Sequence, residues 1–188
     1  RPAFQATGGR DGWVSMELSP LLAADTGGSI AAAARIHAQA ARDNLFVKIP
    51  GTPEGVPAIE ESIFAGIPIN VTLLFSAEQY QAAAEAYLRG IERRLEAGRD
   101  PVVASVASLF VSRWDVAAAE MVPPELRNRL GIAIATQTYA AYRELLASER
   151  WRRLQEAGAD PQRLLWASTG TKDPAASDVL YVEALAAD

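Results

Sequence analysis

Short apolar runs alternate along the chain with longer stretches in which apolar residues recur at helical spacing. The apolar runs predict five strands, at residues 12–18, 45–50, 67–75, 102–111 and 164–168. Because these runs are apolar on both faces, we expect a parallel sheet that helices cover. The order of strands and helices predicts an α/β fold, either doubly wound or a (β/α) barrel. No Gly-x-Gly-x-x-Gly or P-loop follows a strand, which disfavours a doubly wound nucleotide-binding fold.

The helical stretches are predicted at residues 30–42, 56–65, 77–97, 113–121, 131–146, 150–157 and 179–187. Asp25 and Thr26 provide an N-cap for the first helix, and Ser76 with Gln79 forms a capping box ahead of the third. The opening of the 131–146 stretch also fits a strand, but its remainder has helical period. No linker or internal repeat interrupts the pattern, so we expect one domain over residues 1–188.

Composition narrows the classes of function. The 188 residues carry a net charge of −5 without a basic stripe, which argues against a nucleic-acid partner. Cysteine is absent and histidine occurs once, so no usual zinc site can be built and we expect no metal. The longest apolar runs fall well short of the roughly 20 residues that span a bilayer, so we expect no membrane partner. A cytoplasmic location fits this composition.

Lysine is rare in this chain, and its rarity singles out one position. Of the 18 basic residues only Lys48 and Lys172 are lysines, so arginine is the default surface cation. Lys48 lies inside the apolar run LFVKIP, whereas Lys172 lies among polar loop residues. An ammonium in an apolar strand tends to lose its proton, and the neutral amine attacks carbonyl groups. We therefore predict that Lys48 forms a Schiff base with a sugar-type carbonyl substrate.

Other polar residues stand in or just after the predicted strands: Glu17, Asn70, Thr72, Ser105, Ser108, Arg113 and Ser168. In parallel α/β folds the functional groups gather at the carboxyl ends of the strands. Glu17 can shuttle protons through water, and the hydroxyl and amide groups suit substrate hydroxyls. Arg113, at the start of a predicted helix, suits a substrate phosphate.

Three further titratable residues are expected to have no catalytic role. His37 lies in an alanine-rich helix away from any strand end, which indicates a structural residue. Asp115 and Glu120 are expected to be solvated charges on a helix.

The stretch NLFVKIPGTPEGVPAIEESIFAGIPINVTLLFS, at residues 44–76, resembles the Schiff-base lysine strand and the following strand of the transaldolase family. SVASLFVSRWD, at 105–115, is similar to the family strand that carries a phosphate-binding serine and arginine. GWVSMELSP and LLWASTGTKDP match two further strands, and the likeness covers residues 11–183. It implies a (β/α)8 barrel that transfers a dihydroxyacetone unit between ketose phosphates, such as sedoheptulose 7-phosphate and fructose 6-phosphate, and aldose phosphates. The implied pathway is the pentose phosphate pathway, and no metal or organic cofactor takes part.

Carried onto this chain, the resemblance implies that Lys48 is the Schiff-base lysine and that Glu17 orients the catalytic water. Asn70 and Thr72 would lie beside that site. The resemblance also implies substrate contacts further along the chain: phosphate contacts from Ser108 and Arg113, a pocket-lining ring from Phe110 and a further contact from Ser168.

The chain departs from the family pattern in three ways. The family's first strand carries an aspartate that acts as general acid and base and its second carries a TNP-like motif, but neither has a match here. The eighth strand, expected after Glu183, is missing too. The resemblance therefore implies a partial barrel of strands three to seven, a fragment unable to close the barrel or catalyse efficiently alone, since such barrels take about 250 residues. Thr136 and Gln137 replace the commoner Asn-Ala, which is compatible with the subgroup fused to a phosphoglucose isomerase.

Three alternatives to a transaldolase stay open at this point. A fructose 6-phosphate aldolase-like lyase would release the dihydroxyacetone unit instead of passing it to an acceptor. A pyridoxal-phosphate enzyme also uses a lysine Schiff base. An inactive truncated barrel segment, alone or completing its sheet with another chain, would have no activity. The sequence leaves the oligomeric state undetermined.

Overall fold

A five-stranded parallel sheet organises the chain, as described for residues 2–186 in a computed structural model. Its strands are β1 (Val14–Glu17), β2 (Leu45–Pro50), β3 (Ile69–Leu74), β4 (Ser105–Phe110) and β5 (Arg163–Ala167). Each strand pairs in parallel with the next one along the chain, which confirms the α/β class. This sequential order lacks the reversal of a doubly wound sheet and is consistent with a barrel-type fold.

The helices are α1 (Pro2–Ala6), α2 (Thr26–Ala40), α3 (Gly55–Ala65), α4 (Ala77–Glu96), α5 (Ser112–Ala118), α6 (Leu130–Ala147), α7 (Glu149–Glu156) and α8 (Leu180–Ala186). The predicted caps of α2 and α4 are confirmed. Asp25 accepts a hydrogen bond from the Gly28 amide at 2.8 Å. Ser76 accepts one from the Gln79 amide at 3.2 Å, and the Gln79 side chain accepts one from the amide before Ser76 at 2.7 Å.

Several predicted boundaries differ from the observed ones. The ambiguous stretch at 131–146 is entirely helical, whereas α1 and two short 3₁₀ turns, Pro20–Leu22 and Pro124–Leu126, had no apolar pattern to predict them. The strand predicted at 102–111 begins only at Ser105, although Val103 is buried, because apolar runs indicate burial and not backbone pairing. Residues 1, 187 and 188, which include the predicted end of the last helix, lie outside the described residues.

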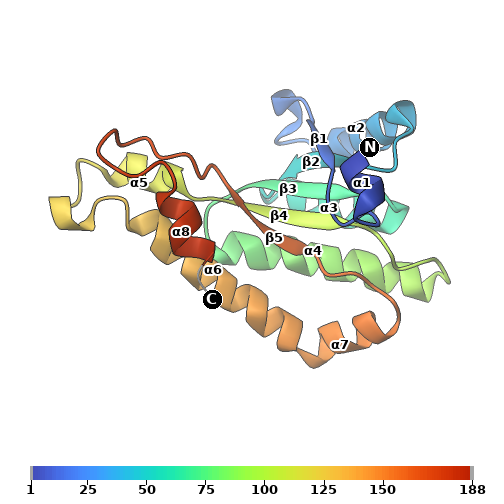
Figure 1. Ribbon diagram of the computed structural model, residues 1–188. Helices are drawn as coiled ribbons and strands as arrows, with labels where there is room; N and C mark the ends of the chain where they lie inside the picture. The colour runs from blue at the N-terminus through green and yellow to red at the C-terminus, as the bar shows by residue number, and fades with distance from the viewer. Residues whose placement is uncertain (1, 187–188) are drawn as a thin grey trace.

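Helices cover one face of the sheet. α2, α3, α4 and α6 pack in chain order along that face (Figure 1). The strand side chains that face them form a fully buried core: Val47, Ile49, Ile69, Val71 and Leu109. Because side chains alternate along a strand, the intervening residues of the same strands face away from the helices, and these include Lys48 and Asn70. None of the helices formed by residues 2–186 is both long and apolar enough to cross a bilayer.

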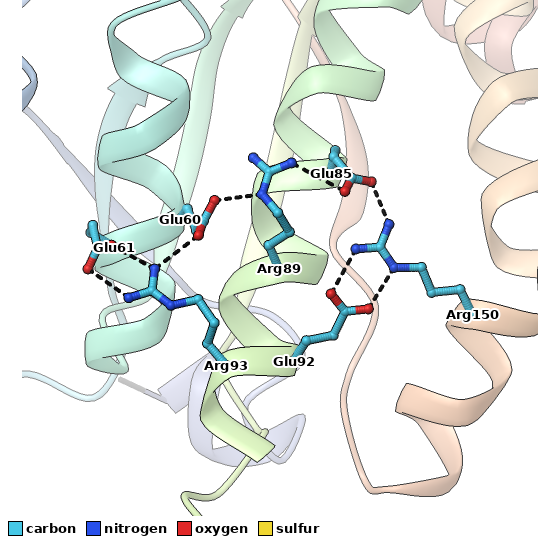
Figure 2. Close-up of polar contacts among 7 residues, drawn as sticks. All are labelled: Glu60, Glu61, Glu85, Arg89, Glu92, Arg93 and Arg150. Atoms are coloured by element: carbon cyan, nitrogen blue, oxygen red, sulfur yellow. Dashed lines mark hydrogen bonds and ion pairs between the residues drawn. The ribbon is translucent and has the colours of Figure 1, made fainter. Parts of the chain in front are cut away.

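A network of seven charged side chains joins α3, α4 and α7: Glu60, Glu61, Glu85, Arg89, Glu92, Arg93 and Arg150 (Figure 2). Arg150 links α7 to α4, since its guanidinium donates to Glu85 at 2.6 Å and to both carboxylate oxygens of Glu92 at 2.6 and 2.8 Å. Hydrogen bonds of this geometry between charged groups are stronger than neutral ones, so the network fixes how the helices lie on the sheet.

Replacing Arg150 with glutamine should lower the free energy of unfolding by about 1 kcal/mol, because it removes three charge-assisted hydrogen bonds from partly exposed groups. Arg153 on the same helix is the matched control, since it forms only an i,i+4 pair with Glu149 at 2.7 Å in which both side chains are over 70% exposed. Arg153→Gln should change stability by less than about 0.5 kcal/mol. Urea unfolding followed by circular dichroism measures both, and equal effects would contradict a special role for the network.

The same network predicts how stability depends on pH. Burial opposes ionisation of Glu60, but hydrogen bonds from Arg89 and Arg93 outweigh it and lower its pKa below the ordinary 4.5. Arg150 lowers the pKa of Glu85 in the same way. A carboxyl group with a lowered folded pKa contributes stability above its unfolded pKa and loses it as the pH falls through the folded value. We expect the unfolding free energy to fall below about pH 4.5, and to fall less in Arg150→Gln.

Candidate active site

Lys48 lies on β2, on the face of the sheet that α2, α3, α4 and α6 leave uncovered. Parallel pairing places it in register with Glu17 of β1 on one side and Asn70 of β3 on the other. Its Nζ donates a hydrogen bond to Glu17 Oε1. The Lys48 side chain is 20% exposed and that of Glu17 is 67% exposed, so the amine is less enclosed than the apolar run around it suggests. A substrate carbonyl can therefore reach the amine from this face.

Asn70, the register neighbour of Lys48 on β3, forms side-chain hydrogen bonds to β4 and β1. Its side-chain oxygen accepts a hydrogen bond from Ser108 Oγ of β4 at 2.7 Å, and its amide nitrogen donates to Ser15 Oγ of β1 at 3.0 Å. Two buried residues, Asn70 and Ser108, and the exposed Ser15 thus form a line of polar groups across the sheet beside Lys48. Because Ser108 has a single hydroxyl hydrogen, which it donates to Asn70, it can reach a phosphate only by giving up that bond.

Thr72 lies one residue pair further along β3 than Asn70, opposite Pro50 of β2. Its hydroxyl is buried and has no hydrogen-bond partner among the described residues. Beyond it the β3–β4 register shifts, and Leu73 takes a left-handed backbone conformation with φ of +57°. Leu74, just beyond this irregularity, is buried in the core.

Arg113 and Phe110 mark the carboxyl end of β4. The Arg113 guanidinium carbon lies 5.4 Å from the centroid of the Phe110 ring, and the residue is exposed. No carboxylate of the described residues forms an ion pair with Arg113, so its charge is free to meet an anion. The Phe110 ring in turn lies 5.5 Å from Phe75 at the end of β3.

Ser168 follows β5 directly and is tied to the start of α5. Its hydroxyl lies 3.0 Å from Ser112 Oγ, and its carbonyl accepts the Ser112 amide at 3.0 Å. Ser168 has φ of +54°, a strained conformation for a residue other than glycine that is common at functional sites. Ser168 therefore contacts Ser112, the residue before Arg113, and lies at the same end of the strands as Arg113.

The structure places Glu17, Lys48, Asn70 and Ser108 on four adjacent strands, with hydrogen bonds from Lys48 to Glu17 and from Ser108 to Asn70, and leaves Ser105 out of this group. Ser105 donates to the Ile69 carbonyl at 2.9 Å and accepts from Gln162 at 2.9 Å, so it satisfies buried polar groups between strands. Lys172, the other lysine, is exposed in the loop after β5. A cavity of about 660 Å³ lies at the opposite ends of the strands, and Ser105 is the one candidate residue among those that line it, so it is not the site.

Four residues near the site were missed by the sequence reasoning: Ser15, Ser112, Trp114 and Asp115. The expectation for Asp115 is wrong, because its side chain is buried and accepts hydrogen bonds from the Leu130 amide at 3.0 Å and from Tyr181 at 2.8 Å. Its partners lie 15 and 66 positions away along the chain. No local pattern indicates such contacts.

Comparison with known proteins identifies the family. The family described as transaldolase/fructose-6-phosphate aldolase matches residues 2–188, so the chain belongs to that family. A transaldolase of Thermobifida fusca is 48% identical over 197 residues, which cover all of this chain and 53% of the relative. Transaldolase 2 of Nostoc punctiforme is 43% identical over 202 residues, covering 98% and 53%. The chain thus spans about half the length of the curated relatives that it matches.

Proposed function

We propose that this chain carries the Schiff-base site of a transaldolase, which transfers a dihydroxyacetone unit from a ketose phosphate to an aldose phosphate. The observation that carries the proposal is the placement of Lys48 between Glu17 and Asn70 on the uncovered face of a parallel sheet. Membership of the transaldolase/fructose-6-phosphate aldolase family supports the same chemistry. Fold alone would not, because barrels of this kind host many reactions.

In the proposed reaction Lys48 passes a proton to Glu17, and the amine so formed adds to the ketose carbonyl carbon. The resulting carbinolamine loses water to give an iminium ion, which withdraws electrons from the bond between the α carbon and the β carbon of the sugar. Transfer of the proton of the β-carbon hydroxyl to a water molecule breaks that bond, releases an aldose phosphate and leaves the three-carbon unit on Lys48 as an enamine. Attack of the enamine on a second aldose phosphate, followed by hydrolysis, restores the amine.

Glu17 is proposed to move the protons of the dehydration and hydrolysis steps. It contacts the amine directly and is largely exposed, so it can hold a water next to the reacting carbon. Asn70 and Ser108 offer groups for substrate hydroxyls, and the buried Thr72 lies beside them on β3. At the strand end, Arg113 with Phe110 and Ser168 would receive the phosphate, since arginine binds phosphate through paired donors.

Borohydride reduction in the presence of fructose 6-phosphate tests the proposal, because it converts the iminium ion into a stable secondary amine. We expect the intact mass of the chain to increase by one reduced sugar unit. No mass increase at saturating sugar would contradict the proposal. Omission of the sugar is the control, and it should leave the mass unchanged.

Glu17→Gln should slow formation of the reducible adduct by about 10- to 100-fold, because glutamine keeps the size of the side chain but cannot carry a proton. The exposed Glu120 is the matched control, and Glu120→Gln should leave the rate unchanged. The measurement is the rate of adduct formation from fructose 6-phosphate. An unaffected rate in Glu17→Gln would remove Glu17 from the proposed mechanism.

A lyase that releases free dihydroxyacetone is the second candidate, because the family description names fructose-6-phosphate aldolase beside transaldolase. Product analysis with and without glyceraldehyde 3-phosphate separates the two. Transfer gives a new ketose phosphate only when the acceptor is present, whereas the lyase releases dihydroxyacetone in its absence.

We also propose that the five strands correspond to strands three to seven of a (β/α)8 barrel. The sequential parallel order supports this, as does the exposure of the β1 side chains, with Val14 at 60% and Met16 at 49%. Within this proposal the chain, as a fragment, needs further strands for full activity. A fused phosphoglucose isomerase part and a cytoplasmic location stay predictions.

A further inference from the structure

The exposed Arg113 guanidinium needs a defined position if it is to bind the anionic end of a substrate. It projects from α5, a helix of only seven residues whose first turn has no side-chain cap. Only Ser112, Asp115 and Ala118 of this helix are buried. A cavity of about 280 Å³ adjoins α5 and is lined by Ser112, Asp115, Tyr181 and others. Specific bonds therefore add to the packing of these three residues in fixing α5.

Trp114 provides one such bond, directed to the end of β3. Its indole Nε1 donates to the Phe75 carbonyl at 2.7 Å. The Phe75 ring lies 6.5 Å from Trp114 in an edge-to-face arrangement and 5.5 Å from Phe110. Phe110 is the ring over which the Arg113 guanidinium lies. The indole thus ties the residue beside Arg113 to the same aromatic group that Arg113 contacts.

Asp115 provides the second bond, directed to the opposite side of α5. Its buried carboxylate accepts the amides of Leu130 at 3.0 Å and Gly131 at 3.2 Å, which are the first two amides of α6. Tyr181 of α8 donates to the same carboxylate at 2.8 Å. A Cβ atom on Gly131 would lie 2.6 Å from Asp115 Oδ2, so the helices meet too closely there for a side chain.

We propose that Trp114 and Asp115 are positioning residues that hold Arg113 at a fixed distance from Lys48 and so place the phosphate of the substrate. The identity of the anion as a sugar phosphate rests on the proposed function. Neither residue needs to touch the substrate. Trp114 anchors α5 to the end of β3, through the Phe75 carbonyl, and Asp115 anchors α5 to α6 and α8.

Trp114→Phe and Asp115→Asn test the proposal with little loss of packing, because the first keeps an aromatic ring and the second keeps the side-chain shape. Each should raise the concentration of fructose 6-phosphate that half-saturates borohydride trapping by about fivefold or more, because a displaced Arg113 no longer lies where its guanidinium can bind the phosphate. The maximal trapping rate should stay within about twofold. Trapping with dihydroxyacetone, which has the carbonyl but no phosphate, should stay within about twofold as well. Trp166→Phe, on β5, is the control for loss of an indole.

Two results would overturn the positioning role. One is an unchanged half-saturating concentration in both variants, and the other is a parallel loss of trapping with both sugars, which would indicate general damage to the fold. Binding of inorganic phosphate, measured by calorimetry, separates this role from the proposed function. If Lys48 is never trapped but both variants still weaken phosphate binding about fivefold, as a displaced arginine requires, the proposed function fails and the positioning role stands. Unchanged phosphate binding overturns the positioning role.

Discussion

Lys48→Arg should abolish the reducible adduct completely, because a guanidinium keeps its proton and cannot form an iminium ion with a ketose. The loss should exceed about 1,000-fold in the rate of trapping, the largest effect expected of any single change in this chain. Arginine preserves the positive charge beside Glu17, so the fold should survive. Intact mass after borohydride reduction measures the adduct, and thermal unfolding checks the fold.

The second lysine offers a control that few chains provide. Lys172→Arg replaces an exposed lysine in the loop after β5 and should leave the adduct yield unchanged. With both variants in hand, every lysine of the chain has been tested. Adduct formation in Lys48→Arg that disappears only in the double variant would assign the chemistry to Lys172 instead.

Arg113→Gln should raise the concentration of fructose 6-phosphate that half-saturates borohydride trapping by about 100-fold. Trapping with dihydroxyacetone, which has no phosphate, should stay nearly unchanged. A bidentate arginine–phosphate contact supplies both charge and paired donors, and glutamine supplies neither. The effect should appear in the half-saturating concentration and not in the maximal rate, as expected for a group that binds the unreacting end of the substrate.

The matched control for this change is Arg35→Gln, which removes one exposed arginine from α2 and alters the net charge equally. Arg35→Gln should leave the trapping of both fructose 6-phosphate and dihydroxyacetone unaffected. An equal loss of trapping with fructose 6-phosphate and with dihydroxyacetone in Arg113→Gln would show that Arg113 acts on something other than phosphate. The assignment of phosphate binding to Arg113 would then be wrong.

The strands, and the position of Lys48 within one of them, were predictable from sequence because their signals are local. An apolar run interrupted by one lysine indicates a buried strand with a special amine, and Glu17 and Asn70 occupy equivalent places in the flanking runs. Parallel pairing then puts all three in register, as the structure shows. The caps of α2 and α4 follow from similarly short motifs.

The contacts around Arg113 could not be predicted, because they join residues far apart in sequence. In the sequence Trp114 is an ordinary aromatic residue of a helix, whereas in the structure its indole donates a hydrogen bond to a carbonyl 39 positions earlier. The sequence predicts a solvated charge at Asp115, whereas in the structure its carboxylate caps α6 and accepts a hydrogen bond from Tyr181. Both bonds depend on how β3, β4 and their helices pack, which is a property of the whole fold.

Peptide mapping of the reduced adduct tests the central claim most directly. Trypsin cleaves after unmodified Lys48, but a reduced sugar on its amine blocks that cleavage and joins residues 43–48 to 49–89 in one peptide. We expect the added mass on the joined peptide at 43–89 when fructose 6-phosphate is present. Added mass on the peptide at 164–188, which contains Lys172, with residues 43–48 released normally, would contradict the account.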